Sequence, residues 1–352
     1  MNDLINANLL NVIPTKILVT GGCGFMASNL ILYLFKKYQN NIEIINIDRL
    51  DYCSNIDFMD VEVSACPKNH YTFVHGDITD FPFMHEFFDK NNDFDIIIHM
   101  AAQTHVDNSF NTPMRFTHDN VIGTHNMLDL AKNKCTKLKK FIHISTDEVY
   151  GEVSLTHDGC TEETLHNPTN PYSASKAAAE MFVKSYYSSF KLPIVIVRSN
   201  NVFGPRQYHE KIIPKFIKFL LEGKKCTIHG DGESRRNFIF TEDFCSAMDI
   251  VMLKGKINEV YNIADQNEFS VLDIVRCLVK KLSPHLKNKS EGNIDEYIEY
   301  VEDRKFNDYR YAINCDKLHA LGWKPTHKFD QAMDITIDYY VNKFVTKIPT
   351  KN

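Results

Sequence analysis

The chain has 352 residues, of which 43% are hydrophobic and 24% are charged, and its formal net charge is -5. This composition is ordinary for a globular protein, and the small negative charge argues against a general nucleic-acid-binding surface. The nine cysteines are scattered without a CxxC pair, which favours reduced thiols over a disulfide framework or a zinc site. No apolar run approaches the roughly 20 residues that span a bilayer, and the N-terminus lacks the pattern of a secretory signal. We therefore expect a cytoplasmic protein without membrane or nucleic-acid partners.

The first half of the chain alternates between short apolar runs and segments with apolar residues at helical spacing. The runs predict buried strands at 16–22, 42–48, 71–78, 94–102, 139–146 and 193–199. The helical spacing predicts helices at 27–38, 120–133 and 172–190. Continuous apolar strands separated by amphipathic helices are typical of a parallel sheet covered on both faces. The pattern therefore predicts an α/β fold with a doubly wound parallel sheet, the Rossmann architecture.

After about residue 200 the pattern becomes less regular. Turn signals lie at 204–209 and 229–237, and a polar segment at 287–296 is expected to be an exposed loop. Further helices are expected at 213–222, 241–253 and 270–282, and a strand at 259–264. We expect this part to form a smaller C-terminal domain that is interleaved with the first.

A glycine-rich turn follows the first predicted strand and opens the first predicted helix. It contains Gly22-x-Gly24-x-x-Ala27, with Gly21 just before. Glycines let the backbone approach a pyrophosphate, whose charge then lies at a helix N-terminus. A plain structural turn is the alternative, but the strand before and the helix after favour a dinucleotide site.

Two aspartates follow the second and third predicted strands. Asp48 ends the second strand, where an acid suits the ribose hydroxyls of NAD and repels the 2′-phosphate of NADP. Asp77 lies after the third strand, where it is expected to meet the adenine amino group. Its alternative role is the N-cap of the helix that follows. The two positions together predict NAD as the cofactor.

Tyr172 and Lys176 are spaced four residues apart on one predicted helix. A phenol with a pKa near 10 is a poor base at neutral pH. A nearby ammonium and the positive charge of a nicotinamide stabilise the phenolate and make it usable. An ordinary amphipathic helix explains an isolated pair equally well, so the interpretation depends on the dinucleotide fold upstream.

The fifth predicted strand ends in Thr146, Asp147 and Glu148. Adjacent side chains on a strand point to opposite faces, but at the strand end both acids can reach one cleft. Two close carboxyl groups push their pKa values apart, so that one serves as an acid and the other as a base. A polar turn after a strand is the alternative.

Six segments in one order, TGGCGFMA, HMAAQTHVD, STDEVYG, YSASK, RSNNVFGPRQ and HEKIIPKFI, resemble the extended short-chain dehydrogenase/reductase family. Within it they look most like the NDP-glucose 4,6-dehydratases, and the resemblance runs from about Lys16 to Trp323. It implies conversion of dTDP- or UDP-glucose to the 4-keto-6-deoxy sugar, a step toward deoxysugars such as rhamnose. It also implies NAD as the cofactor, no metal, and a homodimer.

The resemblance gives each residue of the reacting set a role. Tyr172 takes the proton of the 4-hydroxyl, and Lys176 tunes the phenol. Glu148 removes the C5 proton and Asp147 protonates the leaving 6-hydroxyl. Thr146 binds the 4-oxygen.

The resemblance also assigns binding residues to the cofactor and to the substrate. The cofactor-binding positions are Gly21, Gly24, Phe25, Met26, Asp48, Asp77, Ile78, Ala101, Ala102, Gln103, Tyr172, Lys176 and Asn201. The substrate-binding positions are Thr104, Thr146, Asn200, Lys211, Arg236, Arg304 and Asn307. The NAD-binding domain is expected over 15–200, with 238–278 returning to it, and the nucleotide-sugar-binding domain over 201–237 and 279–345.

The sequence departs from the family pattern mainly on the nucleotide side. Asn307 replaces a histidine, Asn237 and Phe238 replace an aspartate and a tryptophan, and Val271 lies where an asparagine is common. The choice between thymine and uracil therefore stays open. Ala27 replaces a glycine, a change that still allows close packing.

The same residues bear on the alternative functions. A nucleotide-sugar epimerase or decarboxylase shares the fold but does not need Asp147, and a non-catalytic NAD-binding protein typically loses one of the reacting residues.

The homodimer is expected to form through the helices at 120–133 and 172–190. Apolar residues offered for that interface, or for the chain's own core, are Val121, Ile122, Met127, Leu128, Leu130 and Ala131.

Overall fold

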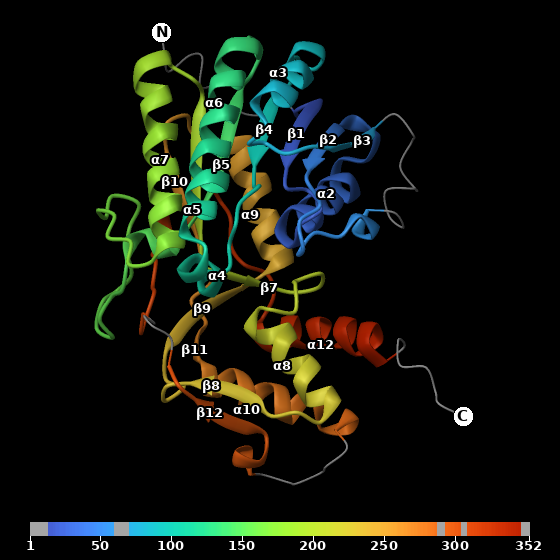
Figure 1. Cartoon of the computed structure of the whole chain (residues 1–352), viewed down its shortest axis with the longest axis vertical. Helices are drawn as coiled ribbons and strands as arrows, with labels where there is room; N and C mark the ends of the chain where they lie inside the picture. The colour runs from blue at the N-terminus through green and yellow to red at the C-terminus, as the bar shows by residue number, and fades with distance from the viewer. Residues whose placement is uncertain (1–12, 60–69, 287–292, 304–307, 346–352) are drawn as a thin grey trace.

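A computed structural model describes residues 13–59, 70–286, 293–303 and 308–345 of the chain. Figure 1 shows a larger region built around one sheet and a smaller region below it. The chain passes between the two regions more than once, because strands of both regions alternate in the second half of the sequence.

The larger region contains a seven-stranded sheet in the order β10-β6-β5-β4-β1-β2-β3. Its neighbouring strands are all parallel. The strands are β1 (Lys16–Thr20), β2 (Glu43–Asp48), β3 (Tyr71–His75), β4 (Ile96–His99), β5 (Lys140–Thr146), β6 (Ile194–Ser199) and β10 (Val260–Ile263). The strand order reverses between β1 and β4, and a ligand crevice forms at such a switch point, outside the carboxyl ends of the strands.

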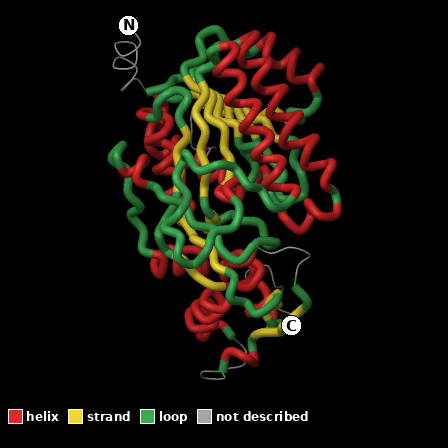
Figure 2. The backbone as a smooth tube through the Cα atoms, turned by 90° about the vertical axis from the view of Figure 1, so that its left-hand side faces the viewer, coloured by secondary structure: helices red, strands yellow, loops and turns green. Residues whose placement is uncertain are grey.

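Helices cover both faces of this sheet, as Figures 1 and 2 show. One core joins α2 (Phe25–Tyr38) and α9 (Thr241–Lys254) to strand residues such as Ile17 and Val19. The other joins α3 (Phe81–Lys90), α6 (Gly123–Lys134) and α7 (Pro171–Phe190) to residues such as Leu18. Successive side chains of a strand alternate between the faces, and burying each Ile, Leu or Val stabilises the fold by about 1.5–3 kcal/mol. The apolar runs are therefore continuous because both faces are packed.

The smaller region is built from short strands and three helices around a separate core. A three-stranded sheet contains β7 (Asn201–Phe203), β9 (Arg235–Phe240) and β11 (Glu268–Ser270). A two-stranded sheet contains β8 (Cys226–His229) and β12 (Ile298–Val301). The helices are α8 (Ile212–Glu222), α10 (Val271–Leu282) and α12 (Phe329–Val345). Strand β9 runs directly into α9, so it carries the chain back to the larger region.

Short helical segments complete the described structure. They are η1 (Gln39–Asn41), η2 (Ile56–Phe58), α4 (Val106–Asn111), α5 (Pro113–Phe116), η3 (Thr117–Ile122), η4 (Asp147–Tyr150), η5 (Ser283–His285), η6 (Ile294–Glu296) and α11 (Asp316–His319). Of these, η3 is a π-helical turn that leads into α6, and η4 contains both acids that follow β5.

The doubly wound parallel sheet with a smaller interleaved region is confirmed. All seven expected strands form, with ends that lie within three residues of the expected ones. The turn expected at 229–237 is wrong at its end, because β9 begins at Arg235. Part of the loop expected at 287–296 lies outside the described residues, and its end forms η6. The helix α12 was not predicted.

The expected division into domains stays a proposal. In the structure α9 and β10 pack with the large sheet, whereas α10 packs into the core of the smaller region.

None of the described helices is long and apolar enough to cross a membrane. The eight cysteines in the described ranges are all free thiols.

Candidate active site

A cavity of about 470 Å³ lies where the carboxyl ends of the large sheet meet the smaller region. Residues of both regions line it, among them most of the residues predicted from the sequence. These are Gly21, Gly24, Phe25, Met26, Asp48, Asp77, Ile78, Ala101, Ala102, Gln103, Thr104, Thr146, Glu148, Tyr172, Lys176, Asn200, Asn201, Lys211 and Arg236. Asp147 is not among the lining residues, and Arg304 and Asn307 lie outside the described part of the chain.

The turn after β1 brings the backbone close to the β4 loop. Gly21 has a φ of +74°, and a Cβ there would lie 2.8 Å from the Cα of Ala101. Helix α2 then begins with Gly24 as its N-cap, without a side-chain cap and without an acid in its first turn. The free amides of a helix N-terminus attract an anion. This end of the cavity therefore suits a pyrophosphate.

Asp48 lies at the end of β2, beside that turn. Its carboxylate accepts hydrogen bonds from the backbone N–H of Cys23 at 2.9 Å and of Leu50 at 2.7 Å. The Ser54 hydroxyl donates to it at 3.1 Å. The acid is thereby fixed at the cavity wall, at the position expected for ribose recognition.

Arg49 joins three carboxylates next to Asp48 in a cluster that was not predicted from the sequence. Its guanidinium donates to Asp119 at 2.5 Å, to Asp51 at 2.8 Å and to Asp77 at 3.1 Å. Burial opposes ionisation of Asp77, but hydrogen bonds from Thr79 and Arg49 lower the pKa of Asp77. Three acids collect around one arginine here, so this end of the cavity has little positive charge to offer a 2′-phosphate.

Asp77 is not a helix N-cap, so that alternative is wrong. The N-cap of α3 is Asp80, whose side chain accepts from the N–H of Phe83 at 3.1 Å. Asp77 instead accepts from the N–H and the hydroxyl of Thr79, each at 2.8 Å. The turn holds the Asp77 carboxylate at the cavity wall.

Helix α7 carries Tyr172 and Lys176 in its first two turns, after a capping box formed by Asn170 and Ser173. The Lys176 ammonium donates to the carbonyl of Ile144 at 2.6 Å, and burial lowers the pKa of Lys176 to about 8. Burial and the Glu148 carboxylate raise the pKa of the Tyr172 phenol. Tyr172 and Lys176 therefore both lie at the cavity. With the chain's own groups alone, however, Lys176 does not lower the pKa of the Tyr172 phenol below its ordinary value.

The two acids of η4 lie in different settings. Glu148 lines the cavity and accepts from the Asn170 amide at 3.1 Å. Asp147 is 5% exposed and accepts from the Thr146 hydroxyl at 3.2 Å and the Asn200 amide at 3.1 Å. Asp147 thus lies behind two cavity-lining residues that hold one oxygen each.

Burial raises the pKa of both acids, and the charge of Arg236 opposes that rise in both, whereas Lys211 acts on Glu148. Burial, followed by the Glu148 carboxylate, raises the pKa of Asp147 to about 7. The raised pKa of Glu148 also comes first from burial, while the Asn170 amide and the charges of Arg236 and Lys211 oppose it. The cations favour an ionised Glu148, and Glu148 in turn favours a protonated Asp147.

A buried ion pair connects η4 to α7. Arg198, on β6, is fully buried and donates to Glu180 of α7 at 2.6 Å and 3.0 Å. It also donates to the hydroxyl of Tyr150, the last residue of η4, at 2.6 Å. Removing one partner of such a buried pair costs about 3–5 kcal/mol. This contact fixes the acid-bearing turn relative to the helix of Tyr172.

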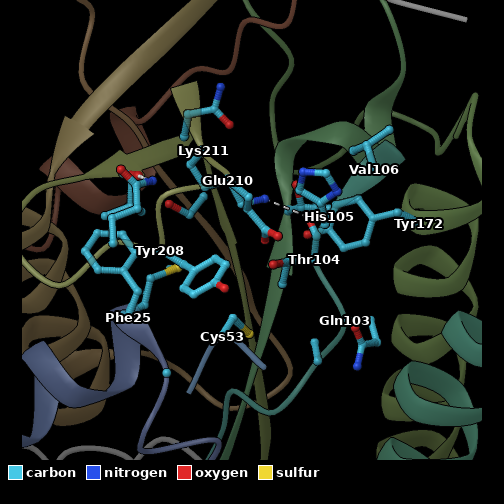
Figure 3. A pocket seen from close by; sticks show the side chains of 18 of the residues that line it. Phe25, Cys53, Gln103, Thr104, His105, Val106, Tyr172, Tyr208, Glu210 and Lys211 are labelled. Atoms are coloured by element: carbon cyan, nitrogen blue, oxygen red, sulfur yellow. Dashed lines mark hydrogen bonds between the residues drawn. The ribbon is translucent and has the colours of Figure 1, made fainter. Parts of the chain in front are cut away.

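The two expected diphosphate ligands approach from the smaller region. The Lys211 ammonium donates to the carbonyl of Thr104 at 2.9 Å, across the cavity (Figure 3). Arg236 donates to the carbonyls of Arg235 at 2.8 Å and Asp308 at 2.8 Å. Both cations donate to neutral carbonyls at the cavity, and a hydrogen bond from a cation to an anionic ligand is stronger than one to a carbonyl.

Several lining residues were not predicted from the sequence. Figure 3 shows Cys53, Tyr208 and Glu210 at the cavity near Thr104 and Lys211. Asp308 and Tyr311 also line it. The DYRY segment, directly after the predicted Asn307, was the available signal for the last two. Within the described ranges no group of His, Cys, Asp or Glu side chains is arranged to hold a metal.

Comparison with known proteins gives three findings. A family model described as GDP-mannose 4,6 dehydratase matches residues 18–336. The dTDP-D-glucose 4,6-dehydratase of Dictyostelium discoideum is 43% identical over 361 residues, which cover 93% of this chain and 82% of that protein. The dTDP-glucose 4,6-dehydratase of Streptomyces venezuelae, crystallised with NAD bound, superposes with a TM-score of 0.84 at 31% identity, covering 93% of this chain and 97% of that one.

A longer relative carries a different nucleotide in its name. The trifunctional UDP-glucose 4,6-dehydratase/UDP-4-keto-6-deoxy-D-glucose 3,5-epimerase/UDP-4-keto-L-rhamnose-reductase of Arabidopsis thaliana is 40% identical over 328 residues. The match covers 93% of this chain and 47% of that protein.

Proposed function

Because the chain belongs to the GDP-mannose 4,6 dehydratase family, we propose that it is an NAD-dependent nucleotide-sugar 4,6-dehydratase. It converts dTDP- or UDP-glucose to the corresponding 4-keto-6-deoxyglucose. One observation carries the proposal: Asp147 and Glu148 lie on one short turn beside Tyr172, with the pKa of Asp147 raised to about 7. An epimerase of the same fold does not need such an acid.

The residues at the β1–α2 turn fit NAD. The turn at Gly21 and the uncapped start of α2 would hold the pyrophosphate, and Asp48 would accept hydrogen bonds from the ribose hydroxyls. Asp77 and Ile78 border the adenine, and Ala101, Ala102 and Gln103 border the nicotinamide. NAD, when bound, takes a hydride from C4 of the sugar and returns it to C6, so the reaction has no net redox change.

Tyr172 and Thr146 act at the 4-oxygen. Tyr172 takes the proton of the 4-hydroxyl as C4 is oxidised, and the Thr146 hydroxyl holds the same oxygen in place. The positive charge of an oxidised nicotinamide, together with Lys176, stabilises the phenolate that burial and Glu148 oppose.

The acid pair removes water across C5 and C6. The 4-ketone acidifies the C5 proton, which Glu148 takes as a base while Arg236 and Lys211 favour its ionised form. Asp147, whose raised pKa favours the protonated form, gives its proton to the leaving 6-hydroxyl. Asn200 and Thr146, which line the cavity, hold the Asp147 carboxyl by one hydrogen bond each and separate it from the cavity by one layer of side chains. Glu148 then returns a proton to C5.

Lys211 and Arg236 bind the diphosphate, and Asn200, Asn201 and Thr104 border the sugar. The roles of Arg304 and Asn307 rest on the resemblance of their segment alone. Relatives named for dTDP and for UDP match this chain at 43% and 40% identity. The proposal therefore covers both nucleotides.

A homodimer belongs to the same proposal. Of the six apolar residues offered for the interface, only Ile122 is exposed, at 43%, and the other five are buried in the chain's own fold. The core alternative is therefore right for those five. Met181 and Phe190 of α7 are 49% and 52% exposed and offer the interface new apolar surface. A cytoplasmic location, which free thiols favour, and a supply of product to rhamnose synthesis complete the proposal.

The test is mass spectrometry of separate incubations with dTDP-glucose and UDP-glucose, with and without added NAD. Loss of one water from either sugar is expected, and the faster substrate identifies the nucleotide. An unchanged mass with formation of the galactose isomer contradicts the proposal in favour of an epimerase.

A further inference from the structure

A third carboxylate, that of Asp308, lies in the cavity wall without a role in the proposed chemistry. Its side chain is 3% exposed, and the residue lines the cavity together with Tyr311 and Glu148. One oxygen, Oδ2, accepts from the Thr169 hydroxyl at 2.8 Å and from the Tyr311 hydroxyl. The other oxygen, Oδ1, is buried and finds no donor among the described residues.

The neighbours of Asp308 place it beside the reacting sugar. Thr169, which holds Asp308, is followed in the chain by Asn170, which holds Glu148 at 3.1 Å. Arg236, the proposed diphosphate ligand, donates to the Asp308 carbonyl at 2.8 Å. Asp308 is therefore tied on one side to the C5 base and on the other to a phosphate-binding cation. A hexose whose C5 lies at Glu148 and whose diphosphate lies at Arg236 would therefore lie next to Asp308.

A buried carboxylate oxygen needs a donor. Leaving such an acceptor unsatisfied is costly, and a hydrogen bond to a charged acceptor is stronger than one between neutral groups. The substrate's diphosphate is an anion and cannot supply that donor. The ring hydroxyls of the sugar are neutral donors of the right kind.

We propose that Asp308 binds the hexose by accepting a hydrogen bond at Oδ1 from the hydroxyl on C2 or C3. This inference rests on the proposed function, which already uses the 4-oxygen at Tyr172 and the 6-oxygen at Asp147. Tyr311 and Thr169 orient the carboxylate by occupying Oδ2. Asp308 thus selects sugars that keep a donor at the bound position.

The experiment combines Asp308→Asn with substrates that lack one hydroxyl. In the variant, the amide oxygen stays with Tyr311 and Thr169, so that an NH₂ group replaces the unpaired acceptor Oδ1. We expect kcat/KM on NDP-glucose, with whichever nucleotide is turned over, to fall about 10- to 100-fold. The wild type is expected to lose a similar factor on either the 2-deoxy or the 3-deoxy analogue. On that analogue, the variant and the wild type should differ by less than about threefold.

Two further variants separate binding from folding. Asp308→Ser keeps a hydroxyl near Tyr311 and Thr169 but is too short to reach the sugar, so it should show the same loss of discrimination. Thr169→Val removes a contact to Oδ2 only, and it should affect NDP-glucose and both deoxy analogues by one common factor. NAD content and the thermal unfolding temperature are measured for each variant.

The outcomes are distinct. If Asp308→Asn loses the same factor on NDP-glucose and on both deoxy analogues, or loses nothing, Asp308 does not bind a ring hydroxyl. If the wild type removes no water from either nucleotide sugar, the proposed function itself fails, and the inference fails with it.

Discussion

The two regions of the molecule contribute different kinds of residue to the cavity. The large sheet presents buried groups at the ends of its strands and on the first turns of its helices, such as Tyr172 and Lys176, which are 8% and 4% exposed. The smaller region presents Lys211 and Arg236, which are partly exposed and are bound to backbone carbonyls. Burial raises the pKa of Tyr172 and lowers the pKa of Lys176 on the sheet side.

The difference indicates that the two regions serve different parts of the proposed reaction: the sheet side carries the proton-transfer groups, and the smaller region carries the diphosphate ligands. Groups that change protonation state lie on the rigid side, where the sheet register and the Arg198–Glu180 pair fix them. Lys211 and Arg236, the proposed diphosphate ligands, lie on the side built from short strands and loops. Changes on the sheet side should therefore act on kcat, and changes on the other side should act on KM.

The largest effect is expected for Tyr172→Phe, which removes the base at the 4-hydroxyl. The rate of nicotinamide reduction by substrate should fall about 10²- to 10⁴-fold, as measured by absorbance in a single turnover. Tyr187→Phe is a matched control, because Tyr187 lies on the same helix but does not line the cavity. A normal rate in Tyr172→Phe contradicts the assignment.

Asp147→Asn should slow water loss about 10²- to 10³-fold while leaving nicotinamide reduction nearly intact. The amide keeps the shape of the acid but cannot protonate the 6-hydroxyl. Reduced nicotinamide should accumulate while mass spectrometry shows little loss of water. Asp158→Asn, at an exposed loop position, is the control, and undiminished dehydration by Asp147→Asn rules out the acid role.

The pH dependence follows from the raised pKa of Asp147, which is about 7. An acid with a raised pKa is protonated below that value and loses its proton as pH rises through it, so elimination should slow about tenfold per pH unit above about 7. The free energy of unfolding should also fall as pH rises. The protonated Asp147 carboxyl favours the folded state, and its contribution is fully present below about pH 4 and lost by about pH 7. A single-turnover pH profile tests this, and the descending limb should be absent from Asp147→Asn.

The smallest effect is expected for Arg236→Gln, which changes a proposed diphosphate ligand in the smaller region. Arg236→Gln should raise KM about tenfold, since a charge-assisted contact to phosphate is lost, and should lower kcat by a smaller factor, because Arg236 also favours the ionised form of Glu148. Arg235→Gln is the matched control, because the neighbouring arginine does not line the cavity. A loss confined to kcat in Arg236→Gln contradicts the division of labour between the two regions.

The same division explains what the sequence could predict. Strand ends such as Asp48 and Thr146 were predictable, because a parallel sheet buried on both faces leaves continuous apolar runs that end at the crevice. Asp77 at the cavity was predicted, but its alternative as a helix N-cap was wrong, because the helix begins one turn later at Asp80. The Arg49 cluster was missed because it joins residues from three separate segments.

The smaller region was less predictable. Its strands are three to six residues long, too short for a clear period. The segment after Asn307 was the available signal for Asp308, but the sequence does not show that one oxygen of Asp308 is buried without a donor among the described residues. The placement of Asp147 behind Thr146 and Asn200 depends on side-chain contacts that no periodicity encodes.

The most direct test of the proposed reaction uses NDP-glucose that carries deuterium on C4. The expected product has lost one water and retains the deuterium on C6, without added reductant, because the same hydride leaves C4 and returns to C6. A dehydrated product that has lost the label contradicts hydride return. A product of unchanged mass contradicts the dehydratase itself.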